Sequence, residues 1–218
     1  MKLNRTVESD EFSDILSMAM MLYAIPHSAT QKTEALVVIP GMDESWRIVQ
    51  ALDLYSGAST SFKHLFVAGV NAEELARHQA LLASLKKDYA ILRDDDHFHL
   101  KLSCVNTKDQ AEWICDEIFN LQLSSLTLFV SPYHLLRAYC AVLKSCLRRN
   151  LDSLAIIPAP VIISPNARFH KDEYNAWELI PGELKRLLKY QIKGDVATYQ
   201  ELRGYLNNLW ASGFLDQS

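Results

Sequence analysis

The most promising residues for chemistry follow the apolar segment 126–130. Ser131 and Pro132 are typical of the N-cap and the first position of a helix, so His134 falls in the first turn and Arg137 one turn later. Free backbone N–H groups, the helix dipole and a guanidinium together favour a phosphate or carboxylate. His134 could act there as a general acid or base. Alternatively, both side chains only solvate the helix end or pair with an acidic neighbour.

Three further polar segments also follow apolar runs. Their candidate ligand-binding residues are Gly41, Asp43, Arg47, Gly69, Asn71, Asn106 and Thr107. Asp43 fits an N-cap, and Arg47 lies about one turn into the helix that it would cap. Structural explanations compete with a ligand here, since Thr107 and Gln110 match the Thr-x-x-Gln pattern of a capping box. A glycine at the end of a strand is also an ordinary turn residue.

Several familiar sites are absent from the sequence. It contains no Gly-x-Gly-x-x-Gly, no Gly-x-x-x-x-Gly-Lys-Ser/Thr and no Gly-x-Ser-x-Gly, which disfavours classical NAD-binding, P-loop and serine-hydrolase functions. Asp95, Asp96, His97 and His99 resemble metal ligands, but alternate residues of an exposed loop seldom converge on one ion without further ligands. We therefore interpret them as a solvated acidic turn and predict no metal site.

The composition indicates a globular protein rather than a nucleic-acid-binding or membrane protein. Of 218 residues, 49% are hydrophobic, and 22 Lys plus Arg against 26 Asp plus Glu give a net charge of −4, too balanced for general nucleic-acid binding. The four cysteines lack Cys-x-x-Cys spacing and are expected to be reduced. The apolar segment 15–25 is too short to cross a bilayer, so we expect a cytoplasmic protein without a membrane anchor.

Apolar runs alternate with helical patterns along most of the chain. Strands are predicted at 35–39, 65–68, 89–92, 99–103, 126–130 and 154–157, the last with an extension at 161–163. Helices are predicted at 10–23, 43–54, 72–86, 108–119, 132–147, 182–191 and 198–209. The alternation favours an α/β fold: a three-layer α/β/α Rossmann-like parallel sheet with additional C-terminal helices. Because ligands bind at the carboxyl ends of parallel strands, the four polar segments should meet at one edge.

We expect one domain in three parts. Residues 1–33 supply an N-terminal helix that packs on the core, residues 34–165 form the Rossmann-like core, and residues 166–218 form a C-terminal helical elaboration of the same domain. The C-terminal part contains mixed charged and aromatic residues, and its two helices each have one apolar face.

The four segments resemble the YdcF/SanA/ElyC-like family of bacterial proteins, a domain of unknown function with a Rossmann-like fold. The resemblance covers roughly residues 34–163. It rests on Leu36-Val-Val-Ile-Pro-Gly41 with Arg47, on Leu65-Phe-Val-Ala-Gly69, on Asn106-Thr107 with Ala111, and on Leu128-Phe-Val-Ser-Pro-Tyr-His134-Leu-Leu-Arg137-Ala138. The chain lacks the Gly-Gly pair usual after the first two strands of that family. It also lacks the anchor of SanA and ElyC, and looks more like the soluble YdcF type.

The resemblance implies that Arg47, Asn106, Thr107, His134 and Arg137 share one pocket. We expect it to bind a small anionic or nucleotide-like metabolite, with the two arginines holding the anion. S-adenosylmethionine is associated with the family and is a candidate cofactor.

Two other functions remain open. One is a group-transfer, phosphoryl-transfer or hydrolase enzyme that uses His134 as its acid or base. The other is an interaction protein that works through the C-terminal helices, which would require exposed aromatic side chains. The aromatic residues concerned are Trp177, Tyr190, Tyr199 and Trp210.

Overall fold

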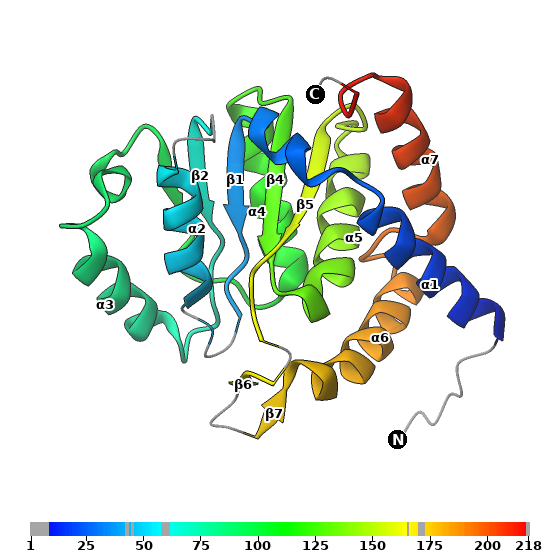
Figure 1. Cartoon of the computed structure of the whole chain (residues 1–218), viewed down its shortest axis with the longest axis horizontal. Helices are drawn as coiled ribbons and strands as arrows, with labels where there is room; N and C mark the ends of the chain where they lie inside the picture. The colour runs from blue at the N-terminus through cyan, green and yellow to red at the C-terminus, as the bar shows by residue number, and fades with distance from the viewer. Residues whose placement is uncertain are drawn as a thin grey trace.

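The computed structural model describes residues 9–41, 44, 46–57, 62–164, 166–169 and 173–216. Within these residues the centre of the molecule is a five-stranded, all-parallel sheet with the strand order β3-β2-β1-β4-β5 (Figure 1). The strands are β1 (Ala35–Val38), β2 (His64–Val67), β3 (Phe98–Leu100), β4 (Ser125–Val130) and β5 (Ala155–Pro160). The predicted α/β class is confirmed.

The central strands β1 and β4 are buried along their whole length, which explains their nearly continuous apolar sequences. Val37 of β1 lies between Phe66 of β2 and Leu128 of β4. Alternate residues of each strand point into different cores, so that Val37 and Leu36 belong to separate hydrophobic clusters on the two faces of the sheet.

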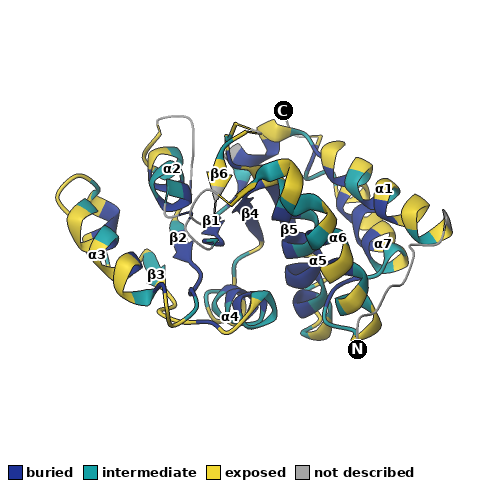
Figure 2. Ribbon diagram, turned by 90° about the horizontal axis from the view of Figure 1, so that it is seen from below, coloured by how far each residue is buried: buried dark blue, intermediate teal, exposed yellow. Residues whose placement is uncertain are grey.

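Helices cover both faces of the sheet, as Figure 2 shows. On one face lie α2 (Trp46–Ser56), α3 (Leu75–Leu85) and the 3-10 turn η2 (Ala90–Arg93), which share a hydrophobic cluster with β1 and β2. On the other lie α4 (Thr107–Asn120) and α5 (Pro132–Arg148). This arrangement is a three-layer α/β/α, Rossmann-like fold.

The two ends of the chain pack beside α5 and β5. Helix α1 (Ser9–Tyr23) contacts α5 and α7 (Tyr199–Ala211), and the 3-10 turn η1 (His27–Lys32) contacts β4 and β5. A two-stranded antiparallel ribbon, β6 (Arg168–Phe169) and β7 (Tyr174–Asn175), precedes α6 (Ala176–Ile192), which packs on α5.

Helix α7 also contacts the edge strand β5. The Tyr205 hydroxyl donates to the Leu154 carbonyl at 2.7 Å and accepts from the Ile156 N–H at 2.8 Å. Tyr139 of α5 donates to the Ile156 carbonyl at 3.0 Å. Two buried tyrosines therefore bind the backbone at the start of β5.

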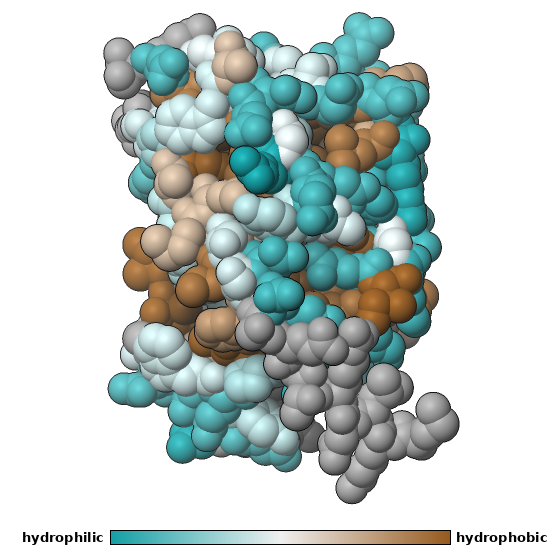
Figure 3. All heavy atoms as spheres, turned by 90° about the vertical axis from the view of Figure 1, so that its right-hand side faces the viewer, coloured by the Kyte–Doolittle hydropathy of each residue, from teal (hydrophilic) through white to brown (hydrophobic). Residues whose placement is uncertain are grey.

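Helix α1 has an exposed apolar face. Its exposed large apolar side chains are Phe12, Leu16, Met20 and Tyr23. Figure 3 shows the side of the molecule that carries α1, α6 and α7, where apolar side chains reach the surface between hydrophilic ones. No helix among the described residues is long and apolar enough to cross a bilayer.

Several predicted elements were wrong or incomplete. The extension predicted at 161–163 is not a strand, and the strand predicted at 99–103 is the shorter β3, with an isolated bridge at Ser103. The segment 89–92 is the turn η2 rather than a strand, because Ile91 and Leu92 are both buried on one face and a four-residue apolar run does not distinguish a strand from a helical turn. The helix predicted at 182–191 begins at Ala176, because Asn175 and Glu178 form a capping box ahead of it. Pro181 lies inside this helix.

Candidate functional site

A pocket of about 350 Å³ lies at the carboxyl edge of the sheet. The chain runs from β1 to β2 on one side, whereas β4 pairs with the other side of β1. The loops after β1 and β4 therefore diverge at this point, where open α/β sheets bind ligands. The predicted site residues that line the pocket are Gly41, Arg47, Asn71, Asn106, Thr107, His134 and Arg137. Gly69 and Ser131 lie outside its lining, and Asp43 lies outside the described residues.

Arg47 is buried in a network of hydrogen bonds between the first and fourth strands. Its Nη1 donates to the Ile39 carbonyl at 2.9 Å, and its Nη2 donates to the Tyr133 hydroxyl at 2.9 Å and forms an ion pair with Glu44. Arg47 is only 1% exposed, and its Nε makes no hydrogen bond to the described residues. Arg47 therefore lines the pocket, but its charge is already neutralised by Glu44.

Glu44 also explains the position of Ser131. The Ser131 hydroxyl donates to Glu44 Oε1 at 3.0 Å and makes no capping bond to the backbone of α5. The prediction that Ser131 is the N-cap of α5 and that Pro132 follows it in the first turn is confirmed, although the Ser131 side chain makes no capping bond.

The two predicted glycines permit close approaches within the protein. A Cβ on Gly41 would lie 2.8 Å from Cζ of Arg47 and would also collide with the Glu44 carboxylate. A Cβ on Gly69 would lie 2.6 Å from the carbonyl carbon of Ser103. Gly41 therefore leaves room for the buried ion pair, and Gly69 lets the loop after β2 pack on the backbone of the next loop.

His134 and Arg137 converge on Glu183 of α6. Arg137 Nε lies 2.6 Å from Glu183 Oε2, and Arg137 Nη2 lies 3.2 Å from Oε1. His134 Nδ1 lies 2.9 Å from Glu183 Oε2 and also 2.9 Å from Arg137 Nη2. Because the carboxylate can only accept, and Arg137 has that carboxylate as an alternative acceptor, we assign a proton to Nδ1 that is donated to Glu183. The neutral ring then carries its lone pair on Nε2.

Burial and neighbouring charges control both titrating groups. Burial, with the Arg137 charge adding to it, lowers the pKa of His134 to about 4, although Glu183 acts in the opposite direction. Burial alone would raise the pKa of Glu183, but its hydrogen bonds and charge interactions with His134 and Arg137 outweigh this and hold the pKa well below its usual range. At neutral pH the pair is a neutral imidazole beside an ionised carboxylate.

The segment before α4 positions the helix and the Arg137 side chain. Asn106 caps α4, accepting from the N–H groups of Lys108 at 2.8 Å and Asp109 at 3.1 Å. Thr107 accepts a hydrogen bond from Arg137 Nη1 at 2.9 Å. The predicted Thr107–Gln110 capping box was therefore wrong, because the Asn106 amide oxygen takes the capping role.

Polar side chains of α4 and of the loop after β2 also hold the backbone in place. The Gln110 amide donates to the Gly69 carbonyl at 2.7 Å, joining α4 to the loop after β2. Asn71 accepts from the Glu74 N–H at 3.1 Å, which fixes the turn before α3. Both amides therefore shape the wall of the pocket.

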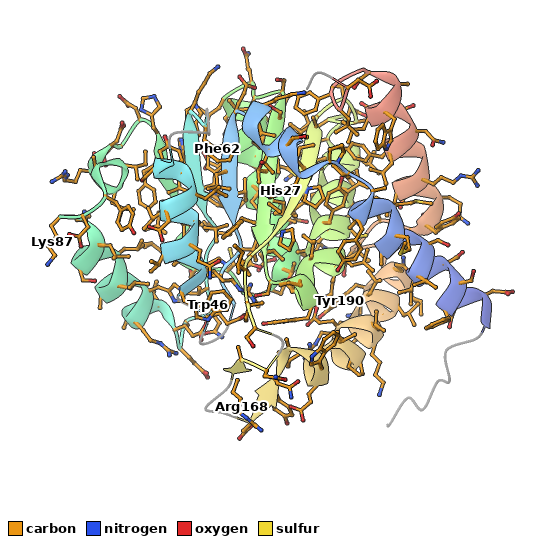
Figure 4. All side chains as sticks on the ribbon, in the orientation of Figure 1. His27, Trp46, Phe62, Lys87, Arg168 and Tyr190 are labelled. Carbon is orange, nitrogen blue, oxygen red and sulfur yellow. The ribbon has the colours of Figure 1, made fainter. Side chains whose placement is uncertain are left out.

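Helix α6 supplies residues that the sequence did not indicate. They are Leu179, Glu183, Arg186 and Tyr190, and they line the side of the pocket away from the sheet. Tyr190 comes from α6 and lies near the carboxyl ends of the strands in Figure 4. Cζ of Arg137 lies 5.9 Å and Nζ of Lys193 lies 5.7 Å from the centroid of its ring.

Of the pocket residues in the loops, Glu44, Glu74 and Tyr133 were also missed. The only local signal was the spacing of a Glu and an Arg three residues apart on one helix, as in Glu183 and Arg186, which form an ion pair. The position of α6 over the sheet edge is a tertiary property with no local signature.

The described lining contains three acidic and three basic side chains. The acids are Glu44, Glu74 and Glu183, and the bases are Arg47, Arg137 and Arg186. The site is therefore polar and balanced in formal charge rather than strongly cationic. Comparison of the sequence with protein-family models and with curated proteins found no match.

Proposed function

We propose that the chain binds a small metabolite with an anionic group and a polar, nucleotide-like body in the pocket between the loops after β1 and β4. The observation that carries this proposal is the pocket itself: it lies where the sheet topology diverges, and buried charged side chains from two strands' loops and from α6 line it. Its volume of about 350 Å³ suits a single small molecule.

The pairing of charges suggests which residue meets the anion. Arg47 and Arg137 are bound to Glu44 and Glu183, so they shape the pocket more than they attract a ligand. Arg186 also contacts Glu183, through Nη1, but its side chain is 53% exposed. Its remaining N–H groups can bind a carboxylate or phosphate at the mouth of the pocket. A ligand with one anionic group fits this balance better than a polyphosphate.

The interior of the pocket offers hydrogen bonds to the rest of the ligand. His134 presents Nε2 as an acceptor, and the amide of Asn71 and the ring of Tyr190 offer further polar and stacking contacts. S-adenosylmethionine, which the resemblance implies, matches this set in having a carboxylate for Arg186, hydroxyls for the amide and an aromatic base for the tyrosine. The resemblance to the YdcF/SanA/ElyC-like family therefore remains a prediction compatible with the site.

A second candidate function is acid–base catalysis in the same pocket. It is favoured by the contact between Glu183 and His134 Nδ1, because a carboxylate on one ring nitrogen fixes the orientation of the imidazole and leaves the other for a substrate proton. A pKa near 4 keeps His134 unprotonated at neutral pH and makes it a base of modest strength. Group transfer or hydrolysis of the bound anion is the matching reaction class.

The interaction hypothesis has weaker support. Of the four aromatic residues considered, Trp177 and Trp210 are exposed, whereas Tyr190 and Tyr199 are partly buried against the core. Trp177 lies in the first turn of α6 beside β7, and Trp210 lies near the end of α7, and Figure 1 places these helix ends on opposite sides of the molecule. They do not form one aromatic patch.

Thermal unfolding in the presence of single ligands tests the binding proposal. The panel is adenosine monophosphate, S-adenosylmethionine, a sugar phosphate and pyrophosphate. A ligand at 100 times its Kd adds about 2.7 kcal/mol, and each kcal/mol shifts Tm by roughly 2–4 °C in a chain of this size. We therefore expect a rise of roughly 5–10 °C for a matching ligand.

Matched variants locate the binding site. Arg186→Ala and His134→Ala should lose most of the rise in Tm, whereas Lys87→Ala, whose exposed side chain lies far from the pocket in Figure 4, should keep it. If no ligand raises the Tm of the folded wild-type chain, the binding proposal is wrong. A ligand that is consumed during the incubation, and is spared by His134→Gln, would favour the catalytic candidate.

A further inference from the structure

Three histidines lie on one face of the sheet, away from the pocket. His64 begins β2, and His97 and His99 flank Phe98 at the start of β3. The strands pair Leu65 with Phe98, so alternation places all three imidazoles on the same side. They lie toward the amino ends of these strands, whereas the pocket lies at the carboxyl ends.

Two of the three ring pairs are spaced as in a tetrahedral metal centre. His64 Nδ1 and His99 Nε2 are 3.1 Å apart, and the His64 ring centroid lies 5.2 Å from that of His99 and 5.4 Å from that of His97. In a tetrahedral zinc site with Zn–N bonds of about 2.0–2.1 Å, neighbouring nitrogens are about 3.3 Å apart and ring centroids roughly 5 Å apart.

Carboxylates lie behind two of the three rings. His97 Nδ1 is 2.9 Å from Asp94 Oδ2, and His99 Nδ1 is 3.9 Å from Glu117 Oε2. Histidines that bind metals commonly donate their other N–H to a carboxylate, which fixes the ring and increases the basicity of the ligand nitrogen. At His97, whose Nδ1 contacts Asp94, Nε2 is the nitrogen left for a metal ion, whereas the 3.9 Å between His99 Nδ1 and Glu117 is too long for a hydrogen bond.

We propose that His64, His97 and His99 bind one divalent transition-metal ion such as Zn²⁺, with water as the fourth ligand. Among the described residues no three such groups already surround a common point. The adjustment needed is at His97, whose ring is hydrogen-bonded to Asp94 and whose side chain is 48% exposed. The His97 ring packs on the ring of His64, and the rest of its surface faces solvent. Asp95 and Asp96 have no part in the site.

Zinc titration by calorimetry and dialysis tests this site on the full chain without an affinity tag. We expect one Zn²⁺ per chain, and at least about tenfold weaker binding in His64→Ala, His97→Ala and His99→Ala. The matched control is His27→Ala, because His27 is an exposed histidine of η1, outside the cluster. Cobalt(II) should give the visible absorption of a tetrahedral site in the wild type and in His27→Ala only.

A second variant guards against loss of folding. Asp94→Asn keeps the size of the side chain and removes the charge hydrogen-bonded to His97 Nδ1, and it should weaken Zn²⁺ binding by about tenfold while circular dichroism stays unchanged. The proposal is overturned if the wild-type chain binds no Zn²⁺, or if any of the three histidine variants binds it as tightly as the wild type.

Discussion

Glu183 of α6 joins His134 and Arg137 of α5 in the wall of the pocket. Its replacement by glutamine is therefore the most direct test of the site. Glu183→Gln keeps the shape of the side chain but removes the charge that Arg137 and His134 contact at 2.6 Å and 2.9 Å. The side chains of Glu183 and Arg137 are only 9% and 12% exposed, so the variant leaves a largely buried guanidinium without its counter-charge. Removing one partner of a buried ion pair costs about 3–5 kcal/mol.

The other contacts of Glu183 change this figure little. Arg186 is 53% exposed in its side chain, and its pairing with Glu183 contributes at most about 1 kcal/mol because solvent screens it. The glutamine amide can still accept one hydrogen bond from Arg137, which places the expected loss of unfolding free energy near the lower limit, about 3 kcal/mol.

Urea denaturation at pH 7 measures the effect. The matched control is Glu112→Gln, which removes a carboxylate that is 40% exposed and lies 4.0 Å from Lys108, and it should cost less than about 1 kcal/mol. If Glu183→Gln costs no more than this control, the Glu183 cluster is solvated, and the pocket is not preorganised as described.

Three further variants should change the folding stability in a direction that the structure predicts. The folded-state pKa of His134, about 4, lies below its ordinary value of 6.5, so the unfolded chain binds the proton more readily. Folding stability is therefore lost as the pH falls from about 6.5 to 4. This contribution, roughly 3 kcal/mol, should be absent when urea denaturation of His134→Gln is measured over the same pH range. Gly69→Ala should lower Tm by several degrees because its Cβ meets the backbone of Ser103 at 2.6 Å. Gly204→Ala, with open space around the new Cβ inside α7, should raise unfolding free energy by about 0.5–1 kcal/mol; calorimetry that finds both glycine variants equally stable would contradict this account of Gly69.

The sequence predicts the sheet and most helices because their signals are local. Buried runs such as 126–130 and the alternation of strands with helices are sufficient for the α/β class. The segment 89–92 failed because a strand and a buried 3-10 turn share the same short apolar pattern. The early start of α6 at Ala176 was hidden by Pro181-Gly182, a pair that usually indicates a break.

The positions of the strand ends predicted which loop residues lie together. They did not predict the acidic side chains that pair with the arginines. The rule that ligands bind at carboxyl ends of strands brought His134 and Arg137 together with Thr107. Glu183 comes from a helix 46 residues beyond Arg137, and no spacing rule connects them. His64 was overlooked as a neighbour of His97 and His99 for the same reason, since strand adjacency is not written in the local sequence.

The tyrosine contacts at β5 have a consequence for solubility. β5 ends the sheet, and a bare edge strand is a template on which a second chain can add its own strand. Tyr205 occupies the N–H of Ile156 and the carbonyl of Leu154, while Pro158 and Pro160 lack the N–H that an added strand would need. Helix α7 therefore blocks the backbone groups through which another chain could pair with β5. A chain shortened before Tyr199 should form oligomers through β5.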